Sequence, residues 1–267
     1  MLSYNTKGKV KVVPQKIGFF IAHFNASNST KELQALIQKL KPFQHQIIII
    51  QNHESFRDRA HIRHENNIYT IHRENTGMNI GAWRQGYELF NNFDYYFFFQ
   101  SECFIKNDNF ITKYIHLFRE NRNLGMIGDS INLNWDQSWE NLKKSSLNQM
   151  ISIQEHNYTE KDITDGKPIL HTSRVEYYQK KLEEWGIATG KNSAVHLRAL
   201  NWCFKKTALD AVKFPIGYSK HECIAAEIAV TRSVIHSGFG IAQSHKEPFT
   251  YIGHPEWRGN GKAVNQT

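Results

Sequence analysis

The sequence predicts an α/β protein built on an open, doubly wound, mostly parallel β-sheet. Short apolar runs alternate with segments of helical periodicity over the first 130 residues of a 267-residue chain. The connections between successive apolar runs are too long for hairpins, so we expect parallel strands joined by right-handed crossovers. Hydrophobic residues make up 40 % of the chain, which is enough for a real core and excludes wholesale disorder.

The elements of the first half follow from hydrophobic period and from turn residues. Ser29 and Glu32 have the spacing of a capping box, and apolar residues at helical spacing follow until Pro42. Continuous apolar runs indicate strands that are covered on both faces. We expect strands at 16–23, 46–51, 68–72, 95–100 and 124–128, and helices from 30 to 41, at 80–90 and at 108–121.

Residues 131–197 interrupt this alternation, because they are polar, rich in Asn, Ser and Lys, and weakly periodic. Inside them, residues 175–185 (VEYYQKKLEEW) predict one amphipathic helix. The stretch is either a solvated excursion packed on the domain edge or a flap on the acceptor side. A strand at 198–205, a helix at 221–236 and a loose tail are expected after it.

No internal repeat or low-complexity linker divides the chain, so we expect a single domain over residues 1–267. Its parts would be a nucleotide-binding half at 16–130, the variable excursion at 131–197 and a C-terminal acceptor-side region at 198–256. No apolar run is long enough to cross a bilayer, and the start of the chain has no signal-peptide pattern. These features indicate a soluble, cytoplasmic protein.

The composition also limits the partners. The net charge of +8 favours an anionic partner such as a nucleotide phosphate, nucleic acid or an anionic lipid surface. The basic residues are spread along the chain without a nucleic-acid-binding motif, so nucleic acid is not expected. Cys103, Cys203 and Cys223 are too widely spaced for a disulfide framework or a metal knuckle.

The residues after each strand are the candidate ligand contacts, because ligands of open parallel sheets bind at the carboxyl ends of the strands. His23 and Asn25 follow the first strand and Asn52 follows the second; they are candidate base or ribose contacts, or ordinary loop residues. Gly77 and Gly81 permit a tight turn and a helix start that can receive an anion. The segment lacks both GxGxxG and a Walker lysine, so dinucleotide and P-loop sites are not indicated.

The fourth strand ends in Gln100-Ser101-Glu102, and a carboxylate in such a place suits a divalent cation on a diphosphate. Together with residues 74–83 (ENTGMNIGAW), these strand ends resemble GT-A-type glycosyltransferases. The similarity is greatest to the family 2-like and rhamnan-synthesis-like enzymes of bacterial surface polysaccharides, including lipopolysaccharide and capsule, which carry ENxGxDxGAW. The resemblance covers 16–130 well and 198–245 loosely. It implies a GT-A, Rossmann-like fold in which Asn75, Gly77, Asn79, Gly81 and Gln100 contact the nucleotide.

Two departures from the family pattern affect the metal. Asn79 replaces the usual Asp, and Gln100-Ser101-Glu102 replaces Asp-x-Asp. Glu102 keeps the carboxylate that usually binds manganese or magnesium, and His245 or His254 falls where related enzymes place a C-terminal metal-binding histidine. The alternative is a site without metal, in which Lys or Arg neutralises the phosphates.

The resemblance also implies a catalytic base in an acidic pair about twelve residues before a glycine. Counting back from Gly238 gives Glu227, with Ala226 in place of the first acid. Glu222 is the competing candidate, and the two lie 140° apart around a helix, so one site can take only one of them. Asn201 and Trp202 match the sugar-holding region, although Trp202 is also typical of a core residue.

We therefore expect a nucleotide-sugar-dependent glycosyltransferase of the hexosyltransferase type. It would move a sugar from a nucleotide diphosphate to a hydroxyl of a glycan or lipid-linked acceptor, by inversion, at the inner face of the membrane. A non-catalytic sugar- or partner-binding protein with the same fold is the alternative, because acidic residues are missing at 79, 100 and 226. A nucleotidyltransferase is a weaker alternative, since no basic Gly-rich loop follows the first strand.

Overall fold

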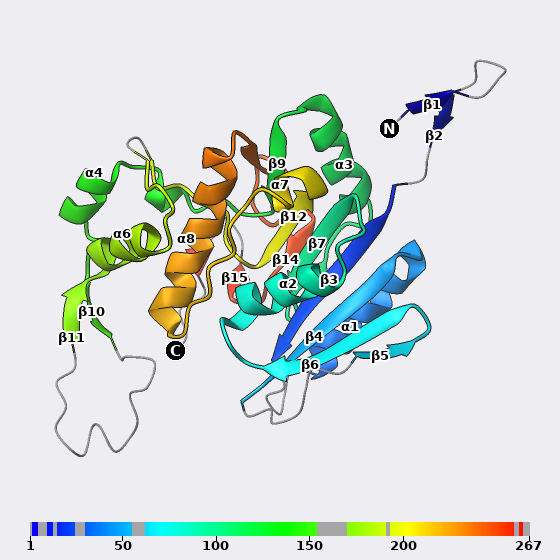
Figure 1. Ribbon diagram of the computed structural model, residues 1–267, viewed down its shortest axis with the longest axis horizontal. Helices are drawn as coiled ribbons and strands as arrows, with labels where there is room; N and C mark the ends of the chain where they lie inside the picture. The colour runs from blue at the N-terminus through cyan, green and yellow to red at the C-terminus, as the bar shows by residue number, and fades with distance from the viewer. Residues whose placement is uncertain are drawn as a thin grey trace.

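The predicted α/β fold is confirmed by the computed structural model, which describes residues 2–4, 10–12, 15–24, 30–54, 62–153, 170–190, 193–258 and 262–263. An eight-stranded sheet runs through its centre (Figure 1). The strands in spatial order are β13 (Gly240–Gln243), β9 (Leu124–Gly128), β12 (Asn201–Lys205), β7 (Tyr95–Gln100), β3 (Ile17–Phe24), β4 (Gln46–His53), β6 (Ile68–Glu74) and β5 (Ile62–Glu65).

The sheet is mostly parallel. β3 pairs in parallel with both β4 and β7, β4 with β6, and β9 with β13. β12 runs antiparallel between β7 and β9, and β5 runs antiparallel to β6. The β5–β6 hairpin turns through Asn66 and Asn67, both with positive φ, which is the geometry of a tight two-residue hairpin turn.

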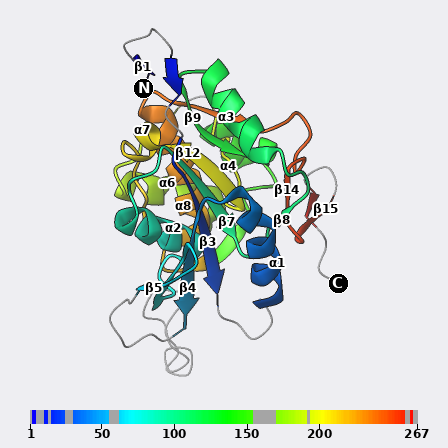
Figure 2. The same cartoon turned by 90° about the vertical axis from the view of Figure 1, so that its right-hand side faces the viewer.

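Helices cover both faces of the sheet because the central strands are apolar on both sides (Figure 2). Phe19, Phe97 and their neighbours pack under α1 (Thr30–Leu40) and α3 (Phe110–Glu120). Phe20 and Phe98 point to the other face, which α2 (Met78–Leu89) and α8 (Lys220–His236) cover. The alternation of strand side chains thus divides one sheet between two cores.

The described residues of the excursion, 131–153, 170–190 and 193–197, pack on the edge of the domain, beside α8 (Figure 1). They contain α4 (Trp139–Lys144), the antiparallel pair β10 (Met150–Ile153) and β11 (Leu170–Ser173), and α6 (Arg174–Glu184). Their interior is apolar, since Trp135, Tyr178 and Leu182 contact Ile228 and its neighbours on α8. The expected amphipathic helix is α6, and its apolar stripe faces this small core.

The remaining elements are short. They are β1 (Leu2–Tyr4), β2 (Val10–Val12), η1 (Lys41–Phe43), β8 (Phe104–Ile105), η2 (Leu133–Trp135), α7 (Lys206–Leu209), β14 (Ile252–Gly253), β15 (Trp257–Arg258) and β16 (Lys262–Ala263). The tail expected to be loose contains a strand pair, β15 with β16. Among the described residues, no helix has the length and apolar character needed to cross a membrane.

The topology brings the candidate residues to one edge of the sheet. β3, β4, β6 and β7 are parallel, so their carboxyl ends, at Phe24, His53, Glu74 and Gln100, lie side by side. β12 is antiparallel to them and therefore begins at this same edge, with Asn201 opposite Phe99. The segment before β12, residues 196–200, consequently lies at this edge, beside residues 130–132 and Gln100.

The turn before α2 requires glycine at position 81. A Cβ on Gly81 would overlap the carbonyl oxygen of Thr76, which is fixed backbone, and would lie 3.1 Å from Arg73 Nη1. We expect Gly81→Ala to lower the free energy of unfolding by about 1–3 kcal/mol, the range for overpacking. Gly240→Ala is the matched control, because its nearest contact would be an ordinary 3.8 Å to Leu124. Equal urea midpoints for the two variants would contradict this reading of the turn.

Candidate functional site

A cavity of about 460 Å³ opens at the carboxyl edge of the sheet. Four structural elements converge on it: the start of α2, the end of β7, the segment before β12 and the first turns of α8. Its lining consists of Gly77, Met78, Asn79, Ile80, Gln100, Asn132, Arg198, Ala199, Leu200, Lys220, Cys223, Ile224, Glu227 and Glu256. Several of the residues predicted from sequence, including Gly77, Asn79, Gln100 and Glu227, therefore share one hollow.

Glu227 is the central carboxylate of this cavity. It lies two turns into α8, and its side chain remains 21 % exposed. The backbone amide of Ala199 donates a hydrogen bond to its carboxylate, and Arg198 stabilises the charge from nearby. Burial outweighs both effects and raises the pKa of Glu227 to about 7. A carboxyl group with this pKa can take up or release a proton near neutral pH.

The segment at residues 196–200 is held firmly against the cavity. The backbone amides of Leu197 and Arg198 donate to Thr231 Oγ1 and to the Ser130 carbonyl, at 3.3 and 3.0 Å. Arg198 Nη2 donates to Asn132 Oδ1 at 3.2 Å. Burial lowers the pKa of Arg198, but Glu227 nearby favours its charged form. The segment thus presents a cation and a backbone amide to the same carboxylate.

Gln100 is fixed at the floor of the cavity by two hydrogen bonds. Its Nε2 donates to the Ala199 carbonyl at 2.6 Å, and its Oε1 lies 3.0 Å from His254 Nε2. Because an amide oxygen only accepts, His254 Nε2 carries the proton in this pair. Burial lowers the pKa of His254, which keeps its ring neutral. Gln100 and His254, far apart in the sequence, therefore form one unit.

The N-terminus of α2 faces the cavity without a side-chain cap. Gly77 occupies the N-cap position with φ of 75°, and no side chain accepts from the first amides of the helix. Arg73 braces the turn by donating to the Thr76 carbonyl at 2.6 Å. Asn75 donates its backbone amide to the His53 carbonyl at 2.9 Å. The exposed amides and the helix dipole make this end of α2 suited to a negative group.

His23 and Asn52 lie at the ends of β3 and β4 and are both buried, at 2 and 1 % exposure. Among the described residues, His23 Nδ1 and Asn52 Oδ1 have no hydrogen-bond partner. Unpaired buried polar atoms are uncommon in folded proteins, so these two are available to a ligand or to water. Asn25 lies outside the described residues.

The candidate metal ligands do not form a built metal centre. Glu102 is half-buried, and burial together with the charges of Glu256 and Glu32 raises its pKa. His245 Nδ1 accepts from the backbone amide of Glu247 and contacts Thr250 Oγ1, both at 3.1 Å. In the part of the chain that the structure describes, no three His, Cys, Asp or Glu side chains gather as ligands for one ion. Glu102 and His245 therefore remain candidate ligands that the described residues do not complete into a three-ligand site.

Three other candidate residues make structural contacts in the capping of α8 or in the core. Glu222 completes the capping box of α8 with Ser219 and pairs with Lys181 at 2.8 Å. Trp202 is fully buried and packs on Trp83, with ring centroids 5.0 Å apart. Asn201 is also buried and donates to the Tyr114 hydroxyl at 3.0 Å. The burial of Trp202 matches its interpretation as a core residue, and we leave the three residues out of the proposed site.

Sequence reasoning missed five residues of this region: Asn132, His196, Arg198, Lys220 and Glu256. Asn132, Arg198, Lys220 and Glu256 line the cavity, and His196 Nε2 lies 3.5 Å from Glu227 Oε1. Arg198 and His196 precede a strand whose direction the sequence did not reveal. Had β12 been expected to run antiparallel, the residues before it, rather than after it, would have been the candidates.

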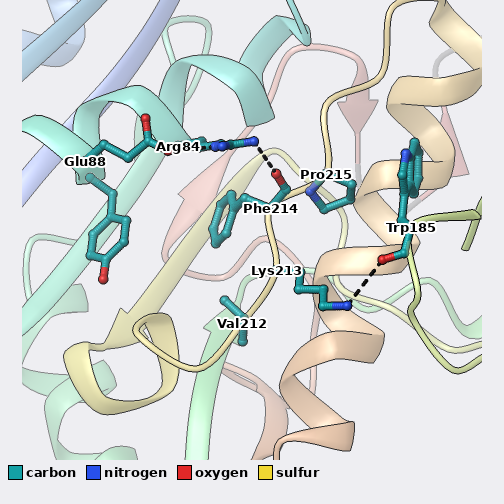
Figure 3. A pocket seen from close by; sticks show the side chains of 8 residues that line it. Arg84, Glu88, Trp185, Val212, Lys213, Phe214 and Pro215 are labelled. Carbon is teal, nitrogen blue, oxygen red and sulfur yellow. Dashed lines mark hydrogen bonds and ion pairs between the residues drawn. The ribbon is translucent and has the colours of Figure 1, made fainter.

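A second cavity, of about 400 Å³, lies on the outer side of α2 (Figure 3). Its charged side chains already have hydrogen-bond or ion-pair partners nearby. Arg84 pairs with Glu88 at 2.8 Å and donates to the Phe214 carbonyl at 3.2 Å, and Lys213 donates to the Gly186 carbonyl at 3.0 Å. The cavity is otherwise lined by apolar groups, so it lacks the converging polar atoms of the Glu227 cavity.

No protein-family model matches the chain, and no curated protein matches its sequence. Three solved structures illustrate its similarities. The catalytic domain of Drosophila β1,4-galactosyltransferase 7, crystallised with xylobiose, has 12 % identity and a TM-score of 0.41, over 95 % of this chain and 78 % of that chain. The bifunctional glycosyltransferase WbbM has 12 % identity and a TM-score of 0.41, over 87 % of this chain and 39 % of that one. TarS (1–349) of S. aureus has 11 % identity and a TM-score of 0.36, over 80 % and 55 %.

These values describe a distant likeness, and the chain spans well under two thirds of the WbbM and TarS structures. All three neighbours are solved structures whose identity to this chain is close to one residue in ten. The α/β class is established by the sheet topology, and function has to be inferred from the residues of the cavity.

The raised pKa of Glu227 predicts a pH-dependent contribution to stability. The folded state binds the Glu227 proton up to about pH 7, whereas the unfolded chain releases it near 4.5. Stability conferred by this proton is therefore complete below pH 4.5 and is lost as the pH rises through 7. From pH 5 to pH 8 the wild type should lose about 2–3 kcal/mol relative to Glu227→Gln. Urea unfolding at both pH values measures this, and a constant difference would contradict it.

Proposed function

We propose that this protein is a glycosyltransferase that moves a sugar from a nucleotide diphosphate donor to a hydroxyl group of an acceptor. The observation that supports it best is the position of Glu227. Its carboxyl group lies in a cavity at the carboxyl edge of a parallel sheet, with a pKa near 7 and with cationic groups beside it. Transfer of a sugar from a phosphate leaving group to a hydroxyl requires a general base and an anion-binding site in one cavity.

In the proposed reaction, Glu227 acts as the general base. The acceptor oxygen forms a bond to the anomeric carbon of the donor sugar while the bond from that carbon to the diphosphate oxygen breaks. Glu227 takes the hydroxyl proton, and the bond electrons leave with the nucleoside diphosphate. A single displacement of this kind inverts the anomeric configuration. A carboxylate with a pKa close to the working pH is a stronger base than an ordinary Glu.

The diphosphate charge would be held by groups of this chain. Arg198 and Lys220 line the cavity, and the uncapped N-terminus of α2 adds backbone amides at Met78 and Asn79. These donors stabilise the leaving diphosphate in a partly enclosed space, where electrostatic interactions are stronger than in water. His23 and Asn52, with their unpaired buried atoms, are the proposed contacts for the nucleoside.

The acceptor is proposed to be a hydroxyl of a glycan or of a lipid-linked sugar. The net charge of +8 favours attraction to an anionic membrane surface, where lipid-linked acceptors lie. The described part of the excursion, residues 131–153, 170–190 and 193–197, borders α8, which carries Glu227, and is the proposed acceptor-side surface. A hexose is the proposed donor sugar. These assignments extend the resemblance of residues 74–83 to surface-polysaccharide enzymes.

The base assignment predicts a separation of binding from transfer. Glu227→Gln should bind the nucleotide-sugar with an affinity within about three-fold of wild type, because it keeps the side-chain volume. Transfer should fall by about 10²–10⁴-fold, the usual value of a general base. Glu222→Gln is the matched control, since Gln also completes a capping box, and it should keep near-wild-type transfer. Calorimetry and product analysis with UDP-, GDP- and dTDP-sugars supply both readouts.

The result that contradicts this assignment is full transfer by Glu227→Gln. Donor binding without any transfer in the wild type would instead identify a sugar-binding protein. Absence of binding across the whole donor panel would reject the nucleotide-sugar site itself.

The donor set of the cavity also predicts how binding responds to metal removal. Arg198 and Lys220 line the cavity, and no three His, Cys, Asp or Glu side chains of the described residues gather as metal ligands, so we expect donor affinity to change by less than about three-fold in EDTA. Lys220→Gln should weaken donor binding about ten-fold, in line with a loss of one charge-assisted contact. Lys246→Gln, outside the cavity lining, is the charge-matched control. Binding that requires manganese and ignores Lys220 would reverse this prediction.

A further inference from the structure

His196 is buried beside Glu227, and its two ring nitrogens can be assigned from their neighbours. Nδ1 lies 3.1 Å from the Ala194 carbonyl oxygen, which only accepts, so Nδ1 carries the proton. Nε2 lies 3.2 Å from Asn132 Nδ2. The amide of Asn132 is oriented by Arg198, which donates to its oxygen, so its NH₂ group must point to His196. Both contacts therefore make Nε2 an acceptor, and its single lone pair already receives the Asn132 NH₂ group.

The imidazole should stay neutral over the working pH range. Burial, aided by the charge of Arg198 and opposed by the Ala194 hydrogen bond, lowers the pKa of His196 to about 4. Its exposed fraction is 2 %, and Trp135 packs edge-on against its ring. A proton on Nε2 would also face the NH₂ group of Asn132, and the two donors would repel. The ring therefore presents a lone pair, and not a positive charge, to its surroundings.

Glu227 Oε1 lies 3.5 Å from this lone pair. An ionised carboxylate has no proton to place between the two atoms, so it gains nothing from His196. A protonated carboxyl can donate to Nε2 after a small approach, and it then shares the Nε2 lone pair with the Asn132 NH₂ group or displaces that group. The same neighbour thus stabilises one protonation state of Glu227 and leaves the other unsupported.

We propose that His196 is a positioning residue whose Nε2 accepts a hydrogen bond from Glu227 once Glu227 has taken the acceptor's proton. This inference rests on the proposed function. The acceptor proton moves to a Glu227 oxygen and stays there, because neutral His196 is the weaker base of the two. His196 then supplies a partner that is present only after proton transfer has begun, which is the kind of interaction that raises a catalytic rate.

The other groups that face Glu227 favour its ionised form or act at longer range. The Ala199 amide and Arg198, both from the segment before β12, favour the carboxylate. Tyr178, from α6, keeps its hydroxyl neutral because burial and the Glu227 charge raise its pKa. Lys220 and Glu256 line the same cavity with opposite charges. His196 is therefore the described neighbour within 3.5 Å that supports the protonated form.

The experiment is a pH titration of the histidine rings by long-range ¹H–¹⁵N NMR. We expect His196 to show the Nδ1–H tautomer and an Nε2 resonance that moves with a midpoint near pH 7, as Glu227 gains its proton, without ring protonation above pH 5. In Glu227→Gln this movement should vanish. His116, which pairs with Glu120 at 2.9 Å on the exposed face of α3, is the matched control.

A kinetic arm separates positioning from packing. His196→Leu removes the acceptor atom and should lower kcat about five-fold at pH 8, with the donor KM within two-fold. His196→Gln offers an amide oxygen in its place and should recover at least half of the loss. An Nε2–H tautomer, an Nε2 resonance that is flat from pH 5.5 to 8.5, or equal kcat for the two variants would overturn the proposal.

The two arms also distinguish this inference from the proposed function. If the protein transfers no sugar, the NMR titration still shows whether His196 and Glu227 share a proton-dependent contact. If transfer occurs and Glu227→Gln abolishes it, a flat titration rejects His196 alone. The titration uses the folded wild-type chain, so it decides the question even if His196→Leu or His196→Gln is unstable.

Discussion

The antiparallel insertion of β12 between β7 and β9 is the constraint on which the site depends. It places the preceding residues, 196–200, at the carboxyl edge of the parallel strands, beside residues 130–132 and Gln100. This segment supplies the Ala199 amide and Arg198 to Glu227, and its Ala199 carbonyl to Gln100. His196, at the start of this segment, lies beside the Glu227 carboxylate. Strand direction therefore assembles one side of the site, and α8 brings Glu227 and Lys220 to it.

A balance of opposing effects sets the chemistry of the cavity. Removing Glu227 from water favours its neutral form, while an amide and a guanidinium favour the ionised form. The resulting pKa near 7 leaves either form accessible at modest free energy. Arg198 has a dual role here, because it orients Asn132 and contributes positive charge where a diphosphate would lie. The neutral Gln100–His254 pair avoids adding negative charge to that place.

The central strands and helices were predictable because each one is marked locally. Isoleucine and phenylalanine runs specify buried strands, and Pro42 and Gly77 mark the ends and starts of helices. The direction of β12 was not predictable, since a short apolar strand has the same pattern in either orientation. The same limit applied to the prediction of the site residues. Glu227, Gln100 and Gly77 stand at strand ends or in a motif, whereas Arg198, Asn132 and His196 meet only through long-range pairing. Trp202 and Asn201 looked like ligand contacts because sequence does not show which side of a strand is covered.

The most direct test of the central claim is the anomeric configuration of the product. The account places one carboxyl group, Glu227, as the base of a single displacement at the anomeric carbon. ¹H NMR of the first-formed product, with a donor of known configuration, reports the outcome through the anomeric coupling constant. The account predicts an inverted linkage. A product that retains the configuration of the donor sugar would contradict it, because retention requires chemistry other than a single displacement assisted by Glu227.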